Sequence, residues 1–483
     1  MKPADATTFT LAALRNEIVG IDTLVPVLDG SHRRYVFLDN AASTPIFRSV
    51  MKSVEEFLPW YAGVNRGVGF KAVVATNVFD ETHKIVGEFV GADLNTNVVI
   101  FGKNTTEAIN KLSNRFHFSP EDVVISTMME HHSNDLPWRK YCRTIHIGIL
   151  SDGSIDLQSL QAELKKHQGH VRLVAVSGAS NVTGICNPIH DIAEWTHAAG
   201  GKIFVDAAQL APHRSIRMLN NDDSRHIDFL AFSAHKIYAP LGIGVLVGPK
   251  EFFEEGPPDS VGGGTVSYVG LEDVEWTGLP QKEEAGSPNV VGAVALAEAL
   301  TVLTDVGMEA IADHERALLE YALPRILKLP GVRVYGPTQN LGNKVGVIPF
   351  NIDGMDHSLV ATILSVEGGI GVRNGNFCAQ VYMRKLLNVS PEDEKLKRAS
   401  RCDNPILPGM VRASFGCYNN EEDVDLFIEM LERIVRKEYR GRYSVDPLTG
   451  LYVAHGFSVQ PSHYFHLFKE HDHRVHLTKE EIA

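Results

Sequence analysis

An acid and a lysine follow two β-rich runs in the middle of the sequence. The run ending in VDAAQ brings Asp206 and Gln209, and the run ending in FSAHK brings Ser233, His235 and Lys236. A lysine and an acid at one sheet edge suit pyridoxal phosphate, because the amine forms a Schiff base with the aldehyde and the acid keeps the pyridine nitrogen protonated. Asp206 and Lys236 could equally be an ordinary surface ion pair.

A third stretch, FGKNTTEAIN, predicts a strand that leads into a helix. Asn104 precedes Glu107 by three residues, as in a capping box, and Thr105 and Thr106 lie beside the free N–H groups of the first turn. A helix N-terminus favours anions and threonine hydroxyls add hydrogen bonds, so this stretch is a candidate phosphate site. A simple helix cap is the alternative.

Two more stretches contribute polar side chains at predicted strand ends. MMEHHSND offers His131, whose ring could stack on a planar cofactor, and SGASNVTG offers Asn181, whose amide could bond the oxygen of the cofactor ring. The pair His131 and His132 could instead bind a metal or cap a helix. Because no third ligand follows at a suitable spacing, we expect no metal here.

Cys378 lies in the unusual setting GVRNGNFCAQ, among glycines, asparagines and an arginine. Cysteine more often behaves as a small buried hydrophobe, so this one is either a reactive thiol or a packing residue. Gly371 and Gly375 would give a loop conformational freedom, and Arg373 could lower the pKa of the thiol.

The elements that must position these residues are short apolar strands alternating with helical patterns from about residue 97. This alternation predicts a mainly parallel sheet with helices on both faces. Ligands of such sheets bind outside the carboxyl ends of the strands, where the polar residues above fall. The predicted strands are NVVIFG, DVVIST, RTIHIGIL, VRLVAVS, KIFVDA, DFLAFS and IGVLVG.

A chain of 483 residues is long enough for two subdomains. We expect a large domain over residues 35–300 and a smaller α+β domain over 301–436, whose last helix is EDVDLFIEMLERIVRKEY, with apolar residues at helical spacing. Residues 1–34 are expected to pack with the small domain, residues 387–409 read as an insertion, and residues 437–483 form a C-terminal extension without a clear period.

Composition narrows the class of protein. Hydrophobic residues make up 44% and charged residues 22%, as in ordinary globular proteins. The net charge of −13, without a basic cluster, disfavours nucleic acids and anionic membranes as partners. Five cysteines without CxxC spacing fit a reducing cytoplasm better than a disulfide scaffold. The N-terminus lacks a signal-peptide core, and no run approaches the roughly 20 apolar residues of a membrane span.

Taken together, these motifs resemble those of the class V, fold-type I family of pyridoxal-phosphate enzymes, and most closely its cysteine desulfurase and selenocysteine lyase branch. The resemblance covers about residues 35–436 and implies a large domain with a mainly parallel seven-stranded sheet and a smaller α+β domain. The motifs that carry it, in order, are YVFLDNAASTP, FGKNTTEAIN, MMEHHSND, SNVTG, VDAAQ, SAHKIYAPLGIGVL, EAGSPN, VRNGNFCA and VRASFGCYNNEEDVD.

The resemblance also implies roles for individual residues. Cofactor contacts would be a Schiff-base lysine and proton shuttle (Lys236), a pyridinium partner (Asp206), ring-oxygen donors (Gln209, Asn181), a stacking ring (His131) and phosphate ligands (Thr105, Thr106, Ser233, His235). Ser287 of EAGSPN would reach the phosphate of a neighbouring subunit, which implies a homodimer. The substrate would be held by Arg412, a bidentate partner for a carboxylate, with Arg373 and Asn181.

By the same resemblance, Cys378 would be the nucleophile that takes sulfur from L-cysteine, leaving a persulfide for an acceptor protein and alanine as product. Three features differ from the branch: Asn376 and Phe377 replace a common histidine before the cysteine, an insertion precedes Arg412, and the tail carries HDHRVH, a motif that either binds metal or is simply solvated. The alternatives are a class V aminotransferase or a C–S or C–N lyase, selenocysteine lyase included, and a scaffold without activity.

Overall fold

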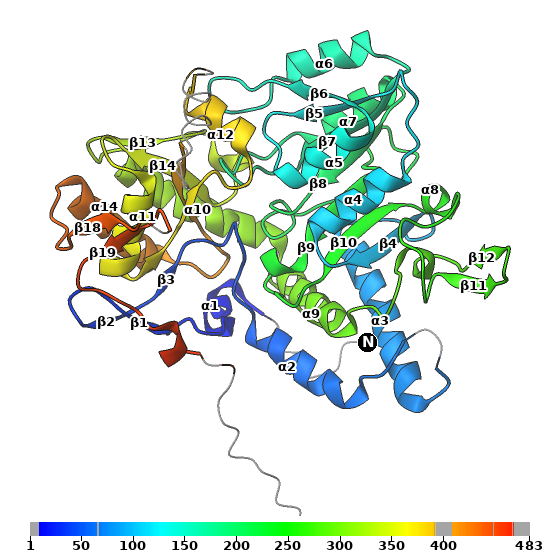
Figure 1. Ribbon diagram of the computed structural model, residues 1–483, viewed down its shortest axis with the longest axis horizontal. Helices are drawn as coiled ribbons and strands as arrows, with labels where there is room; N and C mark the ends of the chain where they lie inside the picture. Colours follow the sequence, from blue (N-terminus) through cyan, green and yellow to red (C-terminus); the bar gives the residue numbers. More distant parts are fainter. Residues whose placement is uncertain are drawn as a thin grey trace, which may run out of the picture.

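The computed structural model describes residues 9–64, 67–390, 392, 408–447, 449–465 and 467. Figure 1 shows a large sheet with its helices to the right and a smaller sheet with its own helices to the left. Most of the insertion expected near 387–409, with Cys402, lies outside the described residues, as does the HDHRVH motif of the tail. No single described helix is long and apolar enough to cross a membrane; α9 (Val290–Val306) and α10 (Met308–Ile326) meet that test only as a pair, across a bend of 75°.

The large sheet has seven strands in the order β4-β10-β9-β8-β7-β5-β6. Only β10 is antiparallel to its neighbours, while β9, β8, β7, β5 and β6 pair in parallel. Every strand predicted from the sequence is present, so the mainly parallel architecture is confirmed. The strands are β4 (Asn97–Gly102), β5 (Val123–Thr127), β6 (Arg143–Ile147), β7 (Val171–Ser177), β8 (Lys202–Asp206), β9 (Phe229–Ser233) and β10 (Gly244–Pro249).

Helices cover both faces of this sheet, which explains why its central strands are mostly apolar rather than alternating between apolar and polar residues. All five residues of β5 and of β9 are buried. The helices of this part are α1 (Leu14–Glu17), α2 (Arg48–Phe57), α3 (Phe70–Phe89), α4 (Thr105–Arg115), α5 (Leu136–Tyr141), α6 (Leu157–Lys166), α7 (Ile189–Ala198), α8 (Lys250–Glu254) and α9 (Val290–Val306). A hairpin of β11 (Val266–Val269) and β12 (Val274–Trp276) projects from the body (Figure 1).

The smaller part packs a second hydrophobic core around a sheet of order β13-β14-β17-β16. Its elements are α10 (Met308–Ile326), β13 (Val332–Val334), β14 (Val347–Ile352), α11 (His357–Gly368), β16 (Arg373–Gly375), α12 (Gln380–Leu386), β17 (Met410–Ser414) and α14 (Glu421–Val435). A two-residue strand β15 (Ile370–Gly371) pairs with β3 (Val36–Phe37).

The N-terminal segment contacts both parts. Leu14 belongs to the core of the large part, whereas Arg15 and Arg34 each pair with Asp423 of α14 at 2.9 Å. β1 (Leu24–Pro26) and β2 (His32–Arg34) form a short antiparallel pair in this segment. The domain boundaries given above stay a prediction.

The first part of the C-terminal extension forms a strand pair, although its sequence shows no clear period. β18 (Tyr443–Val445) and β19 (Tyr452–Ala454) form an antiparallel pair beside α11 (Figure 1). The carboxylate of Glu367 accepts hydrogen bonds from the backbone N–H groups of Arg440 and Gly441 and from the hydroxyl of Tyr443. A buried acid of α11 therefore anchors the start of the extension.

Candidate active site

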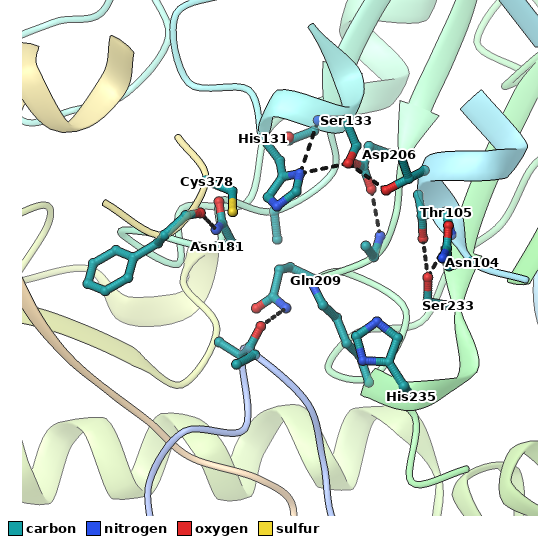
Figure 2. Close-up of a pocket in the computed structure, with 18 of the residues that line it drawn as sticks. Asn104, Thr105, His131, Ser133, Asn181, Asp206, Gln209, Ser233, His235 and Cys378 are labelled. Carbon is teal, nitrogen blue, oxygen red and sulfur yellow. Dashed lines mark hydrogen bonds between the residues drawn. The ribbon is translucent and has the colours of Figure 1, made fainter. Parts of the chain in front are cut away.

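The predicted polar residues converge on one cavity at the carboxyl ends of the parallel strands (Figure 2). β8 ends at Asp206, and β9 ends at Ser233 and continues into the 3-10 turn Ala234–Lys236. The cavity volume of about 290 Å³ is close to the lower end of the range for small-molecule pockets, about 300–1,000 Å³. Its lining includes all the expected pocket residues of this chain: Thr105, Thr106, His131, Asn181, Asp206, Gln209, Ser233, His235, Lys236, Arg373, Cys378 and Arg412.

The N-terminus of α4 opens into one end of the cavity. The side chain of Asn104 caps the helix by accepting a hydrogen bond from the N–H of Glu107 at 3.0 Å. The backbone N–H of Thr105 donates to Ser233 Oγ at 2.7 Å, and the two hydroxyls lie 2.6 Å apart. The first turn of the helix, two hydroxyls and the helix dipole thus gather at one point, a suitable arrangement for binding an anion.

The ring of His131 is fixed by its neighbour Ser133. The N–H of Ser133 donates to Nδ1 of His131 at 3.1 Å, and its Oγ lies 3.0 Å from the same nitrogen. Burial, with a smaller contribution from the charge of Lys236, lowers the pKa of His131 to about 3. The ring is therefore neutral at physiological pH, and because Nδ1 accepts a hydrogen bond, its proton is on Nε2.

Lys236 and Asp206 face the same space from adjacent strands. Burial lowers the pKa of the Lys236 ammonium from 10.5 to about 8, and the negative charge of Asp206 opposes that shift. Burial raises the pKa of Asp206, although its carboxylate accepts a hydrogen bond from Ala208 N–H at 3.0 Å and is attracted to Lys236. Burial also lowers the pKa of His235 to about 4. The cavity therefore holds an amine of unusually low basicity beside an acid.

Two amide side chains line the middle of the cavity. Gln209 Nε2 donates to the carbonyl of Ala41 at 2.9 Å, which leaves its Oε1 buried without a hydrogen-bond partner among the described residues. Asn181 Nδ2 donates to the carbonyl of Phe377 at 2.7 Å (Figure 2). A buried polar atom without a partner is costly, so Gln209 Oε1 marks a place where a polar ligand group fits.

Cys378 lies at the rim of this cavity, with an exposed side chain. Phe377 and Cys378 both have positive φ angles, 50° and 53°, a conformation that costs non-glycine residues roughly 1–3 kcal/mol each. Hydrogen bonds hold this backbone in place: Cys378 O accepts from His132 N–H at 2.7 Å and Phe377 O accepts from Asn181. Strain that the surroundings enforce in this way clusters at functional sites.

The cysteine segment differs from the free loop that its glycines suggest. Gly371 belongs to β15 and pairs with Phe37, and Gly375 ends β16 opposite Met410. Gln380 N–H donates to His132 Nε2 at 3.2 Å, so the residues after the cysteine are anchored as well. The segment between β16 and α12 is therefore short and held on both sides of the thiol.

Arg412 reaches the cavity from β17 with its side chain 3% exposed. It donates to Asp39 Oδ1 at 2.9 Å and to the carbonyl of Asn181 at 2.8 Å, and its guanidinium lies 4.7 Å from the ring centre of Phe377. Its Nε is buried without a hydrogen-bond partner among the described residues. Arg373, which is more exposed, lies 3.8 Å from the other Asp39 oxygen. Two arginines thus share one carboxylate at this end.

Ser287 is the one predicted site residue outside this cavity. It is exposed and lines a separate hollow with Lys103 and Asn289, near the start of α9. The structure of one chain therefore does not bring Ser287 to the residues around Lys236, and its expected role toward a neighbouring subunit is untested.

Three residues with evident positional roles were not found by sequence reasoning. Ser133 orients His131, Asp39 pairs with Arg412, and the buried carboxylate of Glu130 accepts hydrogen bonds from Thr127 and Ser177 at the ends of β5 and β7. Ser133 and Glu130 lie inside the stretch MMEHHSND and Asp39 inside YVFLDNAASTP. All three residues therefore lie inside motifs that the sequence already singles out, but their contacts are long-range and cannot be inferred from spacing.

Comparison with known proteins places this fold and cavity in one class. The family described as "Aminotransferase class-V" matches residues 36–427, which is most of the chain. A probable cysteine desulfurase of Halalkalibacterium halodurans is 35% identical over 432 residues, covering 87% of this chain and 98% of that protein. A cysteine desulfurase of Dickeya dadantii is 34% identical, covering 83% of this chain and 92% of that protein.

Solved structures with a similar fold are also cysteine desulfurases. The apo structure of a cysteine desulfurase from Thermococcus onnurineus superposes with a TM-score of 0.74 at 32% identity, covering 83% of this chain and 95% of that one. A cysteine desulfurase from Escherichia coli gives a TM-score of 0.74 at 28% identity, covering 89% and 100%. The chain therefore belongs to the class V aminotransferase family of pyridoxal-phosphate-dependent enzymes, within its cysteine desulfurase branch.

Proposed function

We propose that this chain is a cysteine desulfurase that converts L-cysteine to L-alanine and receives the sulfur on Cys378 as a persulfide. The observation that carries the proposal is the exposed thiol of Cys378 at the rim of the cavity that contains Lys236. The names of the relatives support it, since proteins 34–35% identical over most of this chain are described as cysteine desulfurases or probable ones.

The residues of the cavity fit pyridoxal phosphate. The N-terminus of α4, with Thr105, Thr106 and Ser233, suits the phosphate, and His235 lies beside it in the lining. The neutral ring of His131 suits stacking on the pyridine. The Oε1 of Gln209, which has no hydrogen-bond partner within the described part of the chain, and the amide of Asn181 suit polar atoms of the ring. Asp206 would meet the pyridine nitrogen, and Lys236 would hold the aldehyde carbon.

When bound, pyridoxal phosphate supplies an aldehyde for the substrate amine and a ring that accepts the electron pairs released at the substrate carbons. The protein's part is to bind and to move protons. Arg412 holds the substrate carboxylate, with Arg373 beside it, through charge-assisted hydrogen bonds. The amine of Lys236, with its pKa lowered to about 8, is basic enough to take the Cα proton and acidic enough to return it.

Sulfur transfer follows from the position of Cys378. Its thiolate attacks the substrate Sγ, a sulfur–sulfur bond forms, the Cβ–Sγ bond breaks, and the electron pair leaves with Cβ, which then takes a proton. The sum is L-cysteine plus the Cys378 thiol giving L-alanine plus the Cys378 persulfide, with no external oxidant. A thiol reductant or an acceptor protein then removes the outer sulfur and restores the thiol.

Two further features belong to the proposal. Ser287 is exposed and outside its own chain's cavity, which supports a homodimer in which it reaches the phosphate of the partner's site. The described cysteines are free, as expected of an enzyme that works in a reducing compartment such as the cytoplasm. Neither a nucleic acid nor a membrane is needed for the proposed reaction.

The test is alanine and sulfide release from L-cysteine in the presence of a dithiol, with wild type and Cys378→Ala side by side. We expect stoichiometric alanine and sulfide from the wild type and neither from the variant, with the cofactor absorbance unchanged in both. Alanine formation that survives in Cys378→Ala would favour selenocysteine lyase or another C–S lyase instead. No alanine from either protein would favour a class V aminotransferase.

A further inference from the structure

A second cluster of chemically capable side chains lies at the opposite edge of the large sheet. His197 is in the last turn of α7, and His226 and Asp228 are in the segment that leads into β9. Lys202, which begins β8, contacts the same carboxylate. Because the cavity of Lys236 is at the carboxyl ends of β8 and β9, this cluster at their amino ends is separate from it.

The possible ligand atoms of this cluster converge. His197 Nε2 lies 2.9 Å from Asp228 Oδ2, and His226 Nε2 lies 3.5 Å from Asp228 Oδ1. The two imidazole rings are nearly parallel, with centres 4.3 Å apart and an angle of 17°. One ligand atom from each residue lies within 4.8 Å of the other two. Asp228 is buried, while both rings remain partly accessible to solvent.

The other nitrogen of each ring is already used. His197 Nδ1 lies 2.7 Å from the carbonyl oxygen of Ser224, and His226 Nδ1 lies 2.6 Å from that of Asp223. A carbonyl only accepts, so both Nδ1 atoms carry protons and donate. Histidine ligands of metals are oriented in this way, by a hydrogen bond from the second ring nitrogen to a carbonyl or carboxylate.

With both protons on Nδ1, the centre of the cluster needs a positive charge. In a neutral ring the Nε2 atoms would present lone pairs to the carboxylate oxygens, so acceptor would face acceptor. A positive charge must therefore lie between them, carried either by second protons on the rings or by a metal ion. The C-terminal end of α7, where His197 sits, also favours a cation through the helix dipole.

We propose that His197, His226 and Asp228 form a binding site for a divalent transition-metal ion, with Zn²⁺ as the best match. Two imidazole nitrogens and one carboxylate oxygen are common zinc ligands, whereas Mg²⁺ and Ca²⁺ prefer oxygen ligands alone. The ion would tie the end of α7 to the segment before β9. The sequence gives no hint of this site, because 28 residues lie between His197 and His226.

Lys202 makes the proposal specific. Its ammonium lies 3.0 Å from Asp228 Oδ1 and competes with a metal for that oxygen, but its side chain is 40% exposed and can turn to solvent. Removing this charge therefore leaves all three ligands in place and should tighten binding. If the cluster were only a hydrogen-bonded network and bound no metal, removing the Lys202 ammonium would give no gain in zinc affinity.

The experiment titrates ZnCl₂ into the full-length holoenzyme by calorimetry, comparing wild type with His226→Gln, Lys202→Gln and His32→Gln. The difference between variants isolates this site from the cysteines and the other histidines. Because loss of an outer-shell partner alone costs about 10- to 100-fold in metal affinity, His226→Gln should weaken one zinc site by at least about 100-fold. Lys202→Gln should tighten that site, and His32→Gln, which changes an exposed histidine in β2, should leave it unchanged.

A zinc stoichiometry and affinity that are the same in wild type, His226→Gln and Lys202→Gln would overturn the proposal and assign the positive charge to protons. If His226→Gln fails to fold, the Lys202 variant decides alone. In that case a zinc-dependent rise in melting temperature that is larger in Lys202→Gln than in wild type supports the site, and an equal or smaller rise refutes it.

Discussion

The reactivity of Lys236 as a function of pH is a specific consequence of how its pocket is built. Burial lowers the pKa of its ammonium from 10.5 to about 8, in spite of the nearby charge of Asp206. At pH 7 about one amine in ten is then neutral, compared with about one in 3,000 for a lysine of unperturbed pKa. Only the neutral amine attacks an aldehyde, so the pocket makes Lys236 roughly 300-fold more available at neutral pH.

The assay is the rate at which cofactor-free protein captures pyridoxal phosphate, followed by absorbance between pH 6 and pH 10. We expect the rate to rise about tenfold per pH unit at first and to level off near pH 8. A lysine derivative free in solution serves as the control, and its rate should keep rising beyond pH 9. A rate for the protein that rises without levelling up to pH 10 would refute the argument from burial.

Replacing Asp206 should change the pKa of Lys236 in a defined direction. Because the negative charge of Asp206 raises the pKa of Lys236 against the effect of burial, Asp206→Asn should lower that pKa further. The pH at which the capture rate levels off should therefore fall below 8, independently of any change in the maximum rate. A midpoint that moves upward would show that Asp206 does not act on Lys236 through its charge.

Three further predictions follow from contacts of the described residues. Ser233→Ala removes a hydroxyl from the anion site beside Thr105 and should weaken pyridoxal-phosphate binding roughly 10- to 100-fold, measured by fluorescence titration; an unchanged affinity would place the phosphate elsewhere. Arg412→Lys loses the planar fork and should lower kcat/KM for L-cysteine about 10- to 100-fold through KM, with unchanged cofactor absorbance; an unchanged KM would contradict carboxylate binding there. Asp423→Asn leaves Arg15 without its buried partner and should lower the free energy of unfolding, measured in urea, by about 3 kcal/mol. Against the opposing effect of burial, hydrogen bonds from Arg15 and Asn419 depress the folded-state pKa of Asp423, so its stabilisation of the wild type is present above pH 3.8 and is lost as the pH falls below that value. Equal unfolding midpoints of the two proteins at pH 7 would show that this pair contributes nothing.

The sequence predicts the sheet well because its strands are buried on both faces. In KIFVD after Lys202, and in FLAFS, every residue before the last is apolar, so the polar residue that closes the apolar run marks both the strand end and the site. Parallel strands then bring Asp206 and Lys236 together without any further information. This is why residues distant in sequence could be assigned to one cavity.

Features that depend on a single long-range contact could not be predicted. Nothing in the spacing shows that Asp39 pairs with Arg412, or that Cys378 lies in a strained backbone held by His132. The glycines near Cys378 suggested freedom, but their conformation is set by strand pairing with distant segments. The cluster of His197 and Asp228 likewise exists only because the end of α7 meets the segment before β9 in space.

The most direct test of the proposed function is a single turnover of the holoenzyme with L-cysteine in the absence of a reductant. Alanine is counted per subunit, and the peptide that contains Cys378 is examined by mass spectrometry under conditions that preserve persulfides. The account predicts one alanine for each Cys378 that gains one sulfur atom, with no gain on Cys142, Cys186 or Cys417. Alanine formed while Cys378 remains unmodified, with sulfide released directly, would contradict it.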